Sequence, residues 1–128
     1  NNISIKFNKT DNFKIIGDRD KLIEIFTNLI DNSIKYSDKN KEITITAKKD
    51  GEYNTVSVAD QGIGIPKESI HRITERFFTV DPSKSRSVGG TGLGLAIVKH
   101  LVSQHRAEMD INSIENKGTT IDIKFNPL

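Results

Sequence analysis

Cysteine and tryptophan are both absent from the 128 residues, and aromatic side chains make up only 6% of them. Without cysteine the chain can form neither disulfides nor thiolate metal sites, and a reducing compartment is permitted. No apolar run approaches the roughly 18 residues that a membrane-spanning helix needs, and no signal peptide opens the chain. Neither sign of charge dominates, since the formal net charge is +2. Charge alone therefore indicates neither nucleic-acid binding nor direct membrane contact.

The composition that remains is that of an ordinary globular domain. Charged residues make up 28% of the chain and hydrophobic residues 34%, a balance typical of folded proteins. This length suits one hydrophobic core, so residues 1–128 are predicted to form a single domain. The chain starts without methionine inside a strand-like run, which indicates a part excised from a longer protein.

Local patterns divide the chain into short strands and helices. Strands are predicted over 3–7, 13–16, 42–49, 53–60, 108–114 and 119–125, mostly from alternating apolar and polar residues. Helices are predicted over 21–36 and 93–105, with a short one around Ile70 and Ile73. Asp18 is placed to cap the first helix, and the polar run 75–92 is predicted to be a lid loop. This order predicts an α+β two-layer sandwich, in which about three helices cover one mixed, mostly antiparallel sheet.

Two asparagines and a lysine share one face of the first predicted helix. Asn28 and Asn32 are four residues apart, and Lys35 follows Asn32 by three. An asparagine carbonyl oxygen suits Mg²⁺, which prefers hard oxygen ligands, and a lysine suits phosphate. These residues indicate an oxygen-ligand and phosphate site, with a solvated helix face as the alternative.

An aspartate and two glycines follow a predicted strand in the run DQGIGIP (60–66). An ionised Asp60 only accepts hydrogen bonds, so it suits an exocyclic amino group. Gly62 and Gly64 let the backbone approach a ligand closely. The alternative is an ordinary turn that happens to follow a strand.

Two further runs are rich in glycine. GGTGLGL (89–95) opens into the last predicted helix, where free N–H groups form an anion site; a flexible hinge and helix cap is the alternative. The run is not a P-loop, because no Gly-Lys-Ser/Thr ends it, and Ile97 stands where a dinucleotide fingerprint has its third glycine. KGTT (117–120) by itself indicates only a hairpin turn.

Taken in order, five motifs resemble those of the catalytic and ATP-binding domain of sensor histidine kinases. NLIDNSIKYS (28–37) resembles the N box, DQGIGIP the G1 box, ERFF (75–78) the F box, GGTGLGL the G2 box and KGTT the G3 box. The resemblance spans essentially the whole chain. It places the chain in the superfamily that includes DNA gyrase, the heat-shock chaperone ATPases and the MutL repair proteins. It implies the Bergerat ATP-binding fold with an ATP lid, and ATP and Mg²⁺ as cofactors.

The resemblance also implies a role for each matching residue. Asp60 would accept the adenine amino hydrogen, Asn32 would bind Mg²⁺ with Asn28 one turn earlier, and Lys35 would contact phosphate. The other residues implied to line the nucleotide site are Tyr36, Gly62, Gly64, Ile65, Gly90, Thr91, Gly92, Leu93, Gly94, Leu95 and Thr119. Phe77 or Phe78 would anchor the lid. The cations available for the terminal phosphate are Arg76, Lys84 and Arg86.

The chain departs from the family pattern at two places. Thr79 stands where relatives commonly have arginine, so one phosphate contact is missing. Arg106 and Ala107 replace the Gly-Gly pair that usually follows the last helix, which alters a turn and should not touch the nucleotide site.

One position separates the branches of the superfamily. The hydrolases and serine kinases have a glutamate four residues before the metal-binding asparagine, where this chain has Asn28. Asparagine cannot accept a proton near neutral pH, so it cannot serve as general base. A neutral imidazole is already nucleophilic, so a histidine acceptor needs no base here. Glu24, one turn further back, is too distant to substitute. Asn28 therefore favours a histidine kinase over a water-directed ATPase or a serine kinase; a nucleotide-binding module without catalysis is the other alternative.

The phosphoacceptor is expected outside this chain. His71, His100 and His105 are not followed by the acidic residue typical of acceptor helices, and His100 and His105 are predicted to have surface or capping roles. The acceptor is expected on an upstream dimerising helical domain of the same kinase, with a response regulator as the next partner. The isolated domain is expected to be a monomer in the cytoplasm, and the full-length kinase a homodimer.

Overall fold

The computed structural model describes residues 3–9, 14–37, 41–76 and 94–126. Within them the elements follow the order β1 (Ser4–Lys9), α1 (Arg19–Lys35), β2 (Glu42–Asp50), β3 (Tyr53–Ala59), the 3₁₀ helix η1 (Lys67–Ser69), α3 (Gly94–Gln104), β4 (Glu108–Ile114) and β5 (Gly118–Phe125). None of the helices in these ranges combines the length and apolar character needed to cross a membrane.

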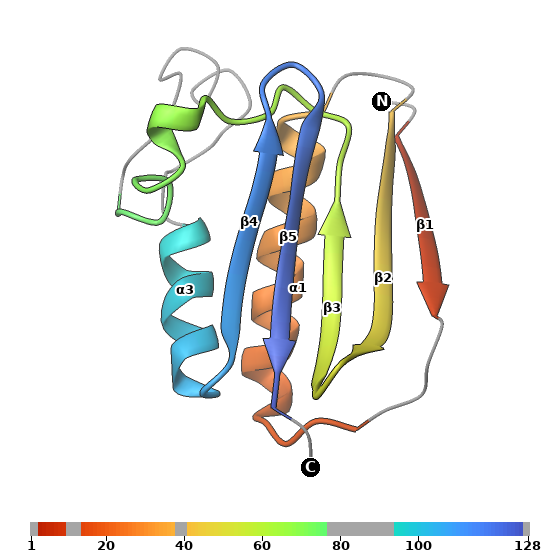
Figure 1. Ribbon diagram of the computed structural model, residues 1–128, viewed down its shortest axis with the longest axis vertical. Coiled ribbons are helices and arrows are strands. Elements are labelled where there is room, and N and C mark those ends of the chain that lie inside the picture. Colours follow the sequence, from red (N-terminus) through yellow and green to blue (C-terminus); the bar gives the residue numbers. More distant parts are fainter. Residues whose placement is uncertain (1–2, 10–13, 38–40, 77–93, 127–128) are drawn as a thin grey trace.

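The five strands form one sheet in the order β1-β2-β3-β5-β4 (Figure 1). β1 pairs with β2 in parallel, and the other three pairs are antiparallel. Both α-helices lie on the same face of the sheet and pack against each other. The prediction of a mixed, mostly antiparallel sheet in a two-layer α+β sandwich is confirmed. In the described residues two α-helices cover it, where about three helices were predicted.

The core lies between the helices and the covered face of the sheet. Val58 of β3 lies opposite both Ile45 of β2 and Ile121 of β5, so apolar side chains continue across the sheet on one face. The buried apolar residues of both layers are Ile25, Leu29, Ile43, Val58, Ile73, Val98, Leu101, Val102, Ile121, Ile123 and Phe125. Polar residues alternate with them along the strands, which is why the other face of the sheet can meet water.

One histidine joins the first turn of α1 to the last turn of α3. Asp18 is the N-cap of α1, because its Oδ1 accepts hydrogen bonds from the N–H groups of Asp20 (3.0 Å) and Lys21 (3.1 Å). The Asp18 N–H in turn donates to Nε2 of His105 at 3.1 Å, while Nδ1 of His105 lies 2.8 Å from the Leu101 carbonyl oxygen. Nδ1 therefore carries the proton. Both predicted capping roles, of Asp18 and of His105, are confirmed.

Two local predictions were wrong. Residues 14–16 do not form a strand. The Lys14 carbonyl oxygen instead accepts a hydrogen bond from Nδ2 of Asn54 at 3.3 Å, which holds this segment beside the start of β3. The short helix expected around Ile70 and Ile73 is a 3₁₀ helix over Lys67–Ser69 followed by turns, and Ile73 is buried. The greater part of the predicted lid, residues 77–92, lies outside the described residues.

The turn after α3 contains an arginine where glycine is the favourable residue. Arg106 has φ 54°, in the left-handed region, and its carbonyl oxygen accepts a bond from Nδ2 of Asn126. We expect Arg106→Gly to raise the free energy of unfolding by about 0.5–1 kcal/mol, because relief of the left-handed strain exceeds the added freedom of the unfolded chain. Urea unfolding measures this change. Asn116→Gly is the matched control, since Asn116 has φ 67° but asparagine tolerates it, so its gain should be smaller. A loss of stability in Arg106→Gly would contradict the expectation.

Candidate functional site

Most of the predicted site residues that the structure describes lie toward one end of the sheet, the upper end in Figure 1. The last turns of α1 carry Asn32, Lys35 and Tyr36, and the loop after β3 carries the segment 60–65. Thr119 lies at the start of β5, which runs beside β3. The antiparallel pairing of β3 with β5 is what brings the end of one strand next to the start of the other.

The Asp60 carboxylate is held by two backbone N–H groups. Its Oδ1 accepts hydrogen bonds from Gly62 at 2.9 Å and from Thr119 at 3.1 Å. The Asp60 N–H donates to the Thr119 carbonyl oxygen at 2.8 Å, so the two residues are bonded in both directions. Among the described residues no donor occupies Oδ2. The carboxylate is therefore rigidly oriented, with one oxygen left to accept a hydrogen bond from a ligand.

The loop that follows Asp60 is bonded to α1 on one side and to the β4–β5 hairpin on the other. The Ile63 N–H donates to the carbonyl oxygen of Tyr36 at 3.1 Å, and the Ile63 carbonyl oxygen accepts from the Asn116 N–H. The Ile65 N–H donates to Oγ of Ser113 at 2.8 Å. These bonds fix the position of the loop from both sides.

Ser113 was missed by the sequence analysis. It lies directly opposite Thr119 in the β4–β5 pair, and its Oγ is 2.8 Å from Oγ1 of Thr119. The sequence places Ser113 in a predicted hairpin, five residues before Gly118. That position indicates a contact with Thr119 only when the register of the two strands is known.

Two glycines are needed here because other backbone comes too close for a side chain. A Cβ on Gly64, which has φ 70°, would collide with the carbonyl oxygen of Ile114. A Cβ on Gly118, with φ 142°, would collide with the carbonyl oxygen of Asp60. The tight packing of these segments around Asp60 therefore depends on glycine at both positions.

The polar face of α1 is turned toward the first turn of α3. Nδ2 of Asn28 donates to the Glu24 carbonyl oxygen at 2.8 Å, which leaves Oδ1 as its free acceptor. A Cβ built on Gly94 would lie 3.6 Å from that Oδ1, so the asparagine and the start of α3 are neighbours. Lys35 forms an ion pair of 3.1 Å with Asp31, one turn earlier on the helix. Asn28 and Gly94, two of the predicted site residues, are thus neighbours, whereas Lys35 reaches toward an acidic neighbour.

The donor set on α1 fits a magnesium–nucleotide complex. Asn28 and Asn32 are half-buried and offer amide oxygens, the hard ligands that Mg²⁺ prefers, alongside water and phosphate oxygens. Gly94 and Leu95 form the first turn of α3, where helix N–H groups favour an anion. Arg76 is exposed and ends the described part of the loop. The remaining predicted residues lie outside the described residues: Phe77, Phe78, Thr79, Lys84, Arg86, Gly90, Thr91, Gly92 and Leu93.

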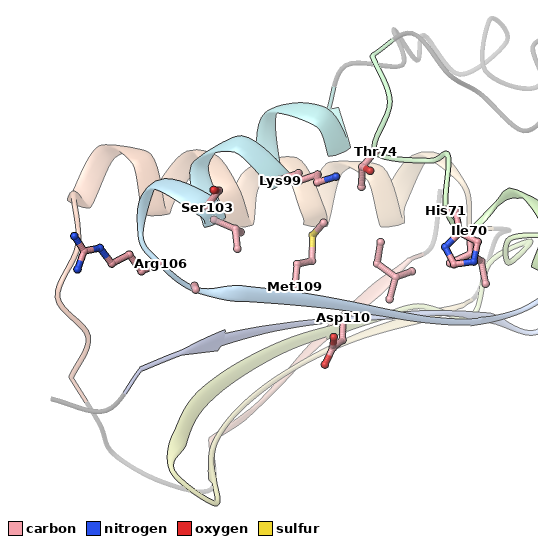
Figure 2. Close-up of a pocket in the computed structure, with 11 residues that line it drawn as sticks. Ile70, His71, Thr74, Lys99, Ser103, Arg106, Met109 and Asp110 are labelled. Carbon is pink, nitrogen blue, oxygen red and sulfur yellow. The ribbon is translucent and has the colours of Figure 1, made fainter.

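A separate pocket of about 690 Å³ lies between α3, β4 and the turns of residues 70–74 (Figure 2). Its apolar lining includes Val102, Met109 and Ile111, and Lys99 and Arg106 also line it. None of the residues predicted to bind nucleotide lines this pocket. It is therefore not the predicted site.

Comparison with known proteins agrees with the fold and the motifs. A family model for the histidine kinase-, DNA gyrase B- and HSP90-like ATPases matches residues 17–128. The chain is 43% identical over 106 residues to the sensor histidine kinase WalK of Bacillus subtilis, covering 81% of this chain and 17% of that protein. It is 38% identical over 123 residues to the sensor-like histidine kinase SenX3 of Mycolicibacterium smegmatis, covering 96% of this chain and 32% of that protein.

A solved structure agrees as well. The full-length ShkA structure in complex with AMPPNP superposes with a TM-score of 0.82 at 27% identity, covering 98% of this chain and 26% of that one. The chain thus spans between 17% and 32% of the length of these three relatives. The matched family, the shared fold and the ordered motifs lead to one conclusion: the chain belongs to the histidine kinase-, DNA gyrase B- and HSP90-like ATPase family, as the ATP-binding catalytic domain of a sensor histidine kinase.

Proposed function

We propose that this domain binds ATP together with Mg²⁺ and transfers the γ-phosphoryl group to a histidine that lies outside the chain. The observation that supports it most is the Asp60 carboxylate, which two N–H groups orient while one oxygen stays available. An acceptor fixed in this way suits the amino group of adenine. ShkA, whose fold this chain shares, was solved in complex with AMPPNP, which supports the same class of ligand.

The proposed roles follow from where the side chains lie. Asn32 provides an amide oxygen for the metal. Asn28 lies one turn before it on α1, beside the first turn of α3. When bound, Mg²⁺ supplies positive charge that neutralises the phosphate oxygens. Lys35 can exchange its exposed partner Asp31 for a phosphate, since an exposed ion pair contributes little. The protein thereby positions the nucleotide and leaves the nucleophile to the acceptor.

The geometry of Asn28 supports the kinase over the hydrolase. Its amide nitrogen donates to the Glu24 backbone carbonyl, so this side chain is fixed as an amide with only a weakly basic oxygen exposed. Such a group cannot take a proton from water or from a serine hydroxyl. An acceptor histidine does not require that step.

The partners are also part of the proposal. His105 is engaged by two backbone groups, and His71 and His100 are exposed. We expect none of them to be the acceptor, which would lie on a dimerising helical domain of the same kinase. The relatives are named as sensor kinases, which supports a response regulator as partner. We expect the full-length protein to be a homodimer that works in the cytoplasm.

The first test is the base preference of the Asp60 site. Asp60→Ala should weaken ATP binding by about 10- to 150-fold, which is what a hydrogen bond to a charged group contributes. GTP should bind the unaltered domain less well than ATP, because its carbonyl oxygen would face the carboxylate. Calorimetric titration with Mg²⁺ present measures both affinities.

A matched control for this test is available on the same sheet. Asp122→Ala removes a carboxylate from β5 on the face opposite the core, where it bonds Ser57, and should leave ATP affinity unchanged. Equal affinities of the unaltered domain for ATP and GTP would overturn the role of Asp60.

A further inference from the structure

The Ser113 hydroxyl makes three polar contacts, and their chemistry determines where each hydrogen lies. Oγ of Ser113 is 2.8 Å from the Ile65 nitrogen, 3.0 Å from the Gly118 carbonyl oxygen and 2.8 Å from Oγ1 of Thr119. A hydroxyl has one hydrogen to donate and two lone pairs that accept. These three contacts use all of that capacity.

Two of the three contacts have only one direction. The Gly118 carbonyl oxygen can only accept, so it takes the hydrogen of Ser113. The Ile65 N–H can only donate, so it occupies one lone pair. The Thr119 hydroxyl must then donate to the second lone pair of Ser113. If Ser113 donated to Thr119 instead, Oγ of Ser113 and the Gly118 carbonyl oxygen would lie 3.0 Å apart without a hydrogen between them.

The Thr119 oxygen is left with lone pairs only. Its hydrogen is committed to Ser113, and its own backbone N–H holds the Asp60 carboxylate. Thr119 and Asp60 therefore both present acceptors, and neither can donate from its side chain. Such a pair favours an N–H group of a base and opposes a carbonyl oxygen at the same position.

We propose that Ser113 is a specificity-determining positioning residue. It holds the Thr119 hydroxyl as an acceptor, so that the site selects 6-aminopurine nucleotides over 6-oxopurine nucleotides. This inference rests on the proposed function, in which Asp60 binds the base; Thr119 adjoins that carboxylate through its own N–H. Asp60 supplies the charge, and Ser113 keeps the hydrogen of the Thr119 hydroxyl away from a purine carbonyl.

The test compares the affinity for ATP with that for inosine triphosphate, whose base has a carbonyl oxygen in place of the amino group. In Ser113→Ala the Thr119 hydroxyl can turn and donate to that carbonyl. The preference for ATP should fall by about 3- to 10-fold, the range of one neutral hydrogen bond. In this variant the Ile65 N–H loses its acceptor. That loss should weaken the binding of ATP and of inosine triphosphate equally, so it cancels in the ratio of their dissociation constants. Calorimetry on the whole chain with Mg²⁺ gives both dissociation constants.

Three further variants separate this role from a structural one. Ser113→Thr keeps the hydroxyl and should keep the preference of the unaltered domain. Thr119→Val removes the rotatable hydrogen, so adding Ser113→Ala in that background should leave the ratio unchanged. Ser57→Ala, a strand serine that bonds Asp122 on the other face of the sheet, should also leave it unchanged.

The outcomes distinguish the two levels of the proposal. Equal weakening of both nucleotides in Ser113→Ala, with the ratio intact, would show a purely structural serine and overturn the inference. A further fall of the ratio in the Thr119→Val background would overturn it as well, because the effect would then not pass through Thr119. If the unaltered domain binds neither nucleotide, it is the proposed function that fails.

Discussion

Replacement of Asn32 by alanine is expected to slow phosphoryl transfer severely while ATP remains bound. Asn32 is half-buried near the end of α1, and its amide oxygen is the proposed ligand of Mg²⁺. The metal neutralises charge on the phosphates, and its loss should slow transfer by on the order of 10²–10³, corresponding to several kcal/mol of lost stabilisation. Binding should weaken less, since the adenine contacts at Asp60 do not involve the metal.

The measurement is phosphohistidine formed from radiolabelled ATP in the whole kinase, with ATP affinity determined in parallel. Phosphohistidine is labile in acid and stable in base, which identifies the product. Asn112→Ala is the control, because it removes an exposed asparagine from β4. Normal transfer in Asn32→Ala would refute the role of this residue, and acid-stable label on this domain alone would favour a serine kinase instead.

The second large effect is expected for Gly64→Ala, which should lower both the free energy of unfolding and the affinity for ATP. The added Cβ would strain a residue at φ 70° and would also collide with the Ile114 carbonyl oxygen. Because that oxygen belongs to backbone, relief requires the hairpin to move away from the loop. We expect a loss of about 2–4 kcal/mol in the free energy of unfolding, as for other overpacked backbone sites. ATP affinity should fall as well, since Ile65 and Ser113 would separate.

Gly51→Ala is a close control for this prediction. Gly51 has φ 61°, nearly the same backbone conformation, but nothing lies within 4 Å of an added Cβ. The free energy of unfolding of Gly51→Ala should therefore fall by only about 1 kcal/mol, the cost of the left-handed conformation, and its ATP affinity should be unchanged. Thermal unfolding of both variants measures the difference. Similar losses in the two variants would show that the collision with Ile114 does not matter.

The local structure was largely predictable because it depends on residues one or two turns apart. Helical spacing placed α1 within two residues of its observed start, and Asp18 was recognised as its cap. Alternation located both hairpins, since one face of each strand is buried. The strand expected over 13–16 failed for a physical reason: a short apolar run has no strand structure unless a neighbour pairs with it, and Asn54 bonds the Lys14 carbonyl oxygen instead.

The candidate site was predictable in its residues but not in its contacts. The sequence indicated Asp60 as an acceptor, yet nothing local shows that the Thr119 N–H, 59 residues away, would hold its Oδ1. Ser113 was overlooked because it gains meaning only from lying opposite Thr119 in the strand register. The ion pair between Lys35 and Asp31 differs from these contacts, because its partners are four residues apart on one helix and the spacing is visible in the sequence.

The sequence by itself determined the kinds of element, the helix cap and the order of the five motifs, because these depend on periodicity and on the chemistry of neighbouring residues. Only the tertiary structure decided that β5 lies between β3 and β4, and that the hydroxyl of Ser113 meets the loop after Asp60. Strand order and register arise from contacts between segments far apart in the chain. A one-residue change of register would turn Ser113 to the opposite face of the sheet and leave Thr119 without its partner.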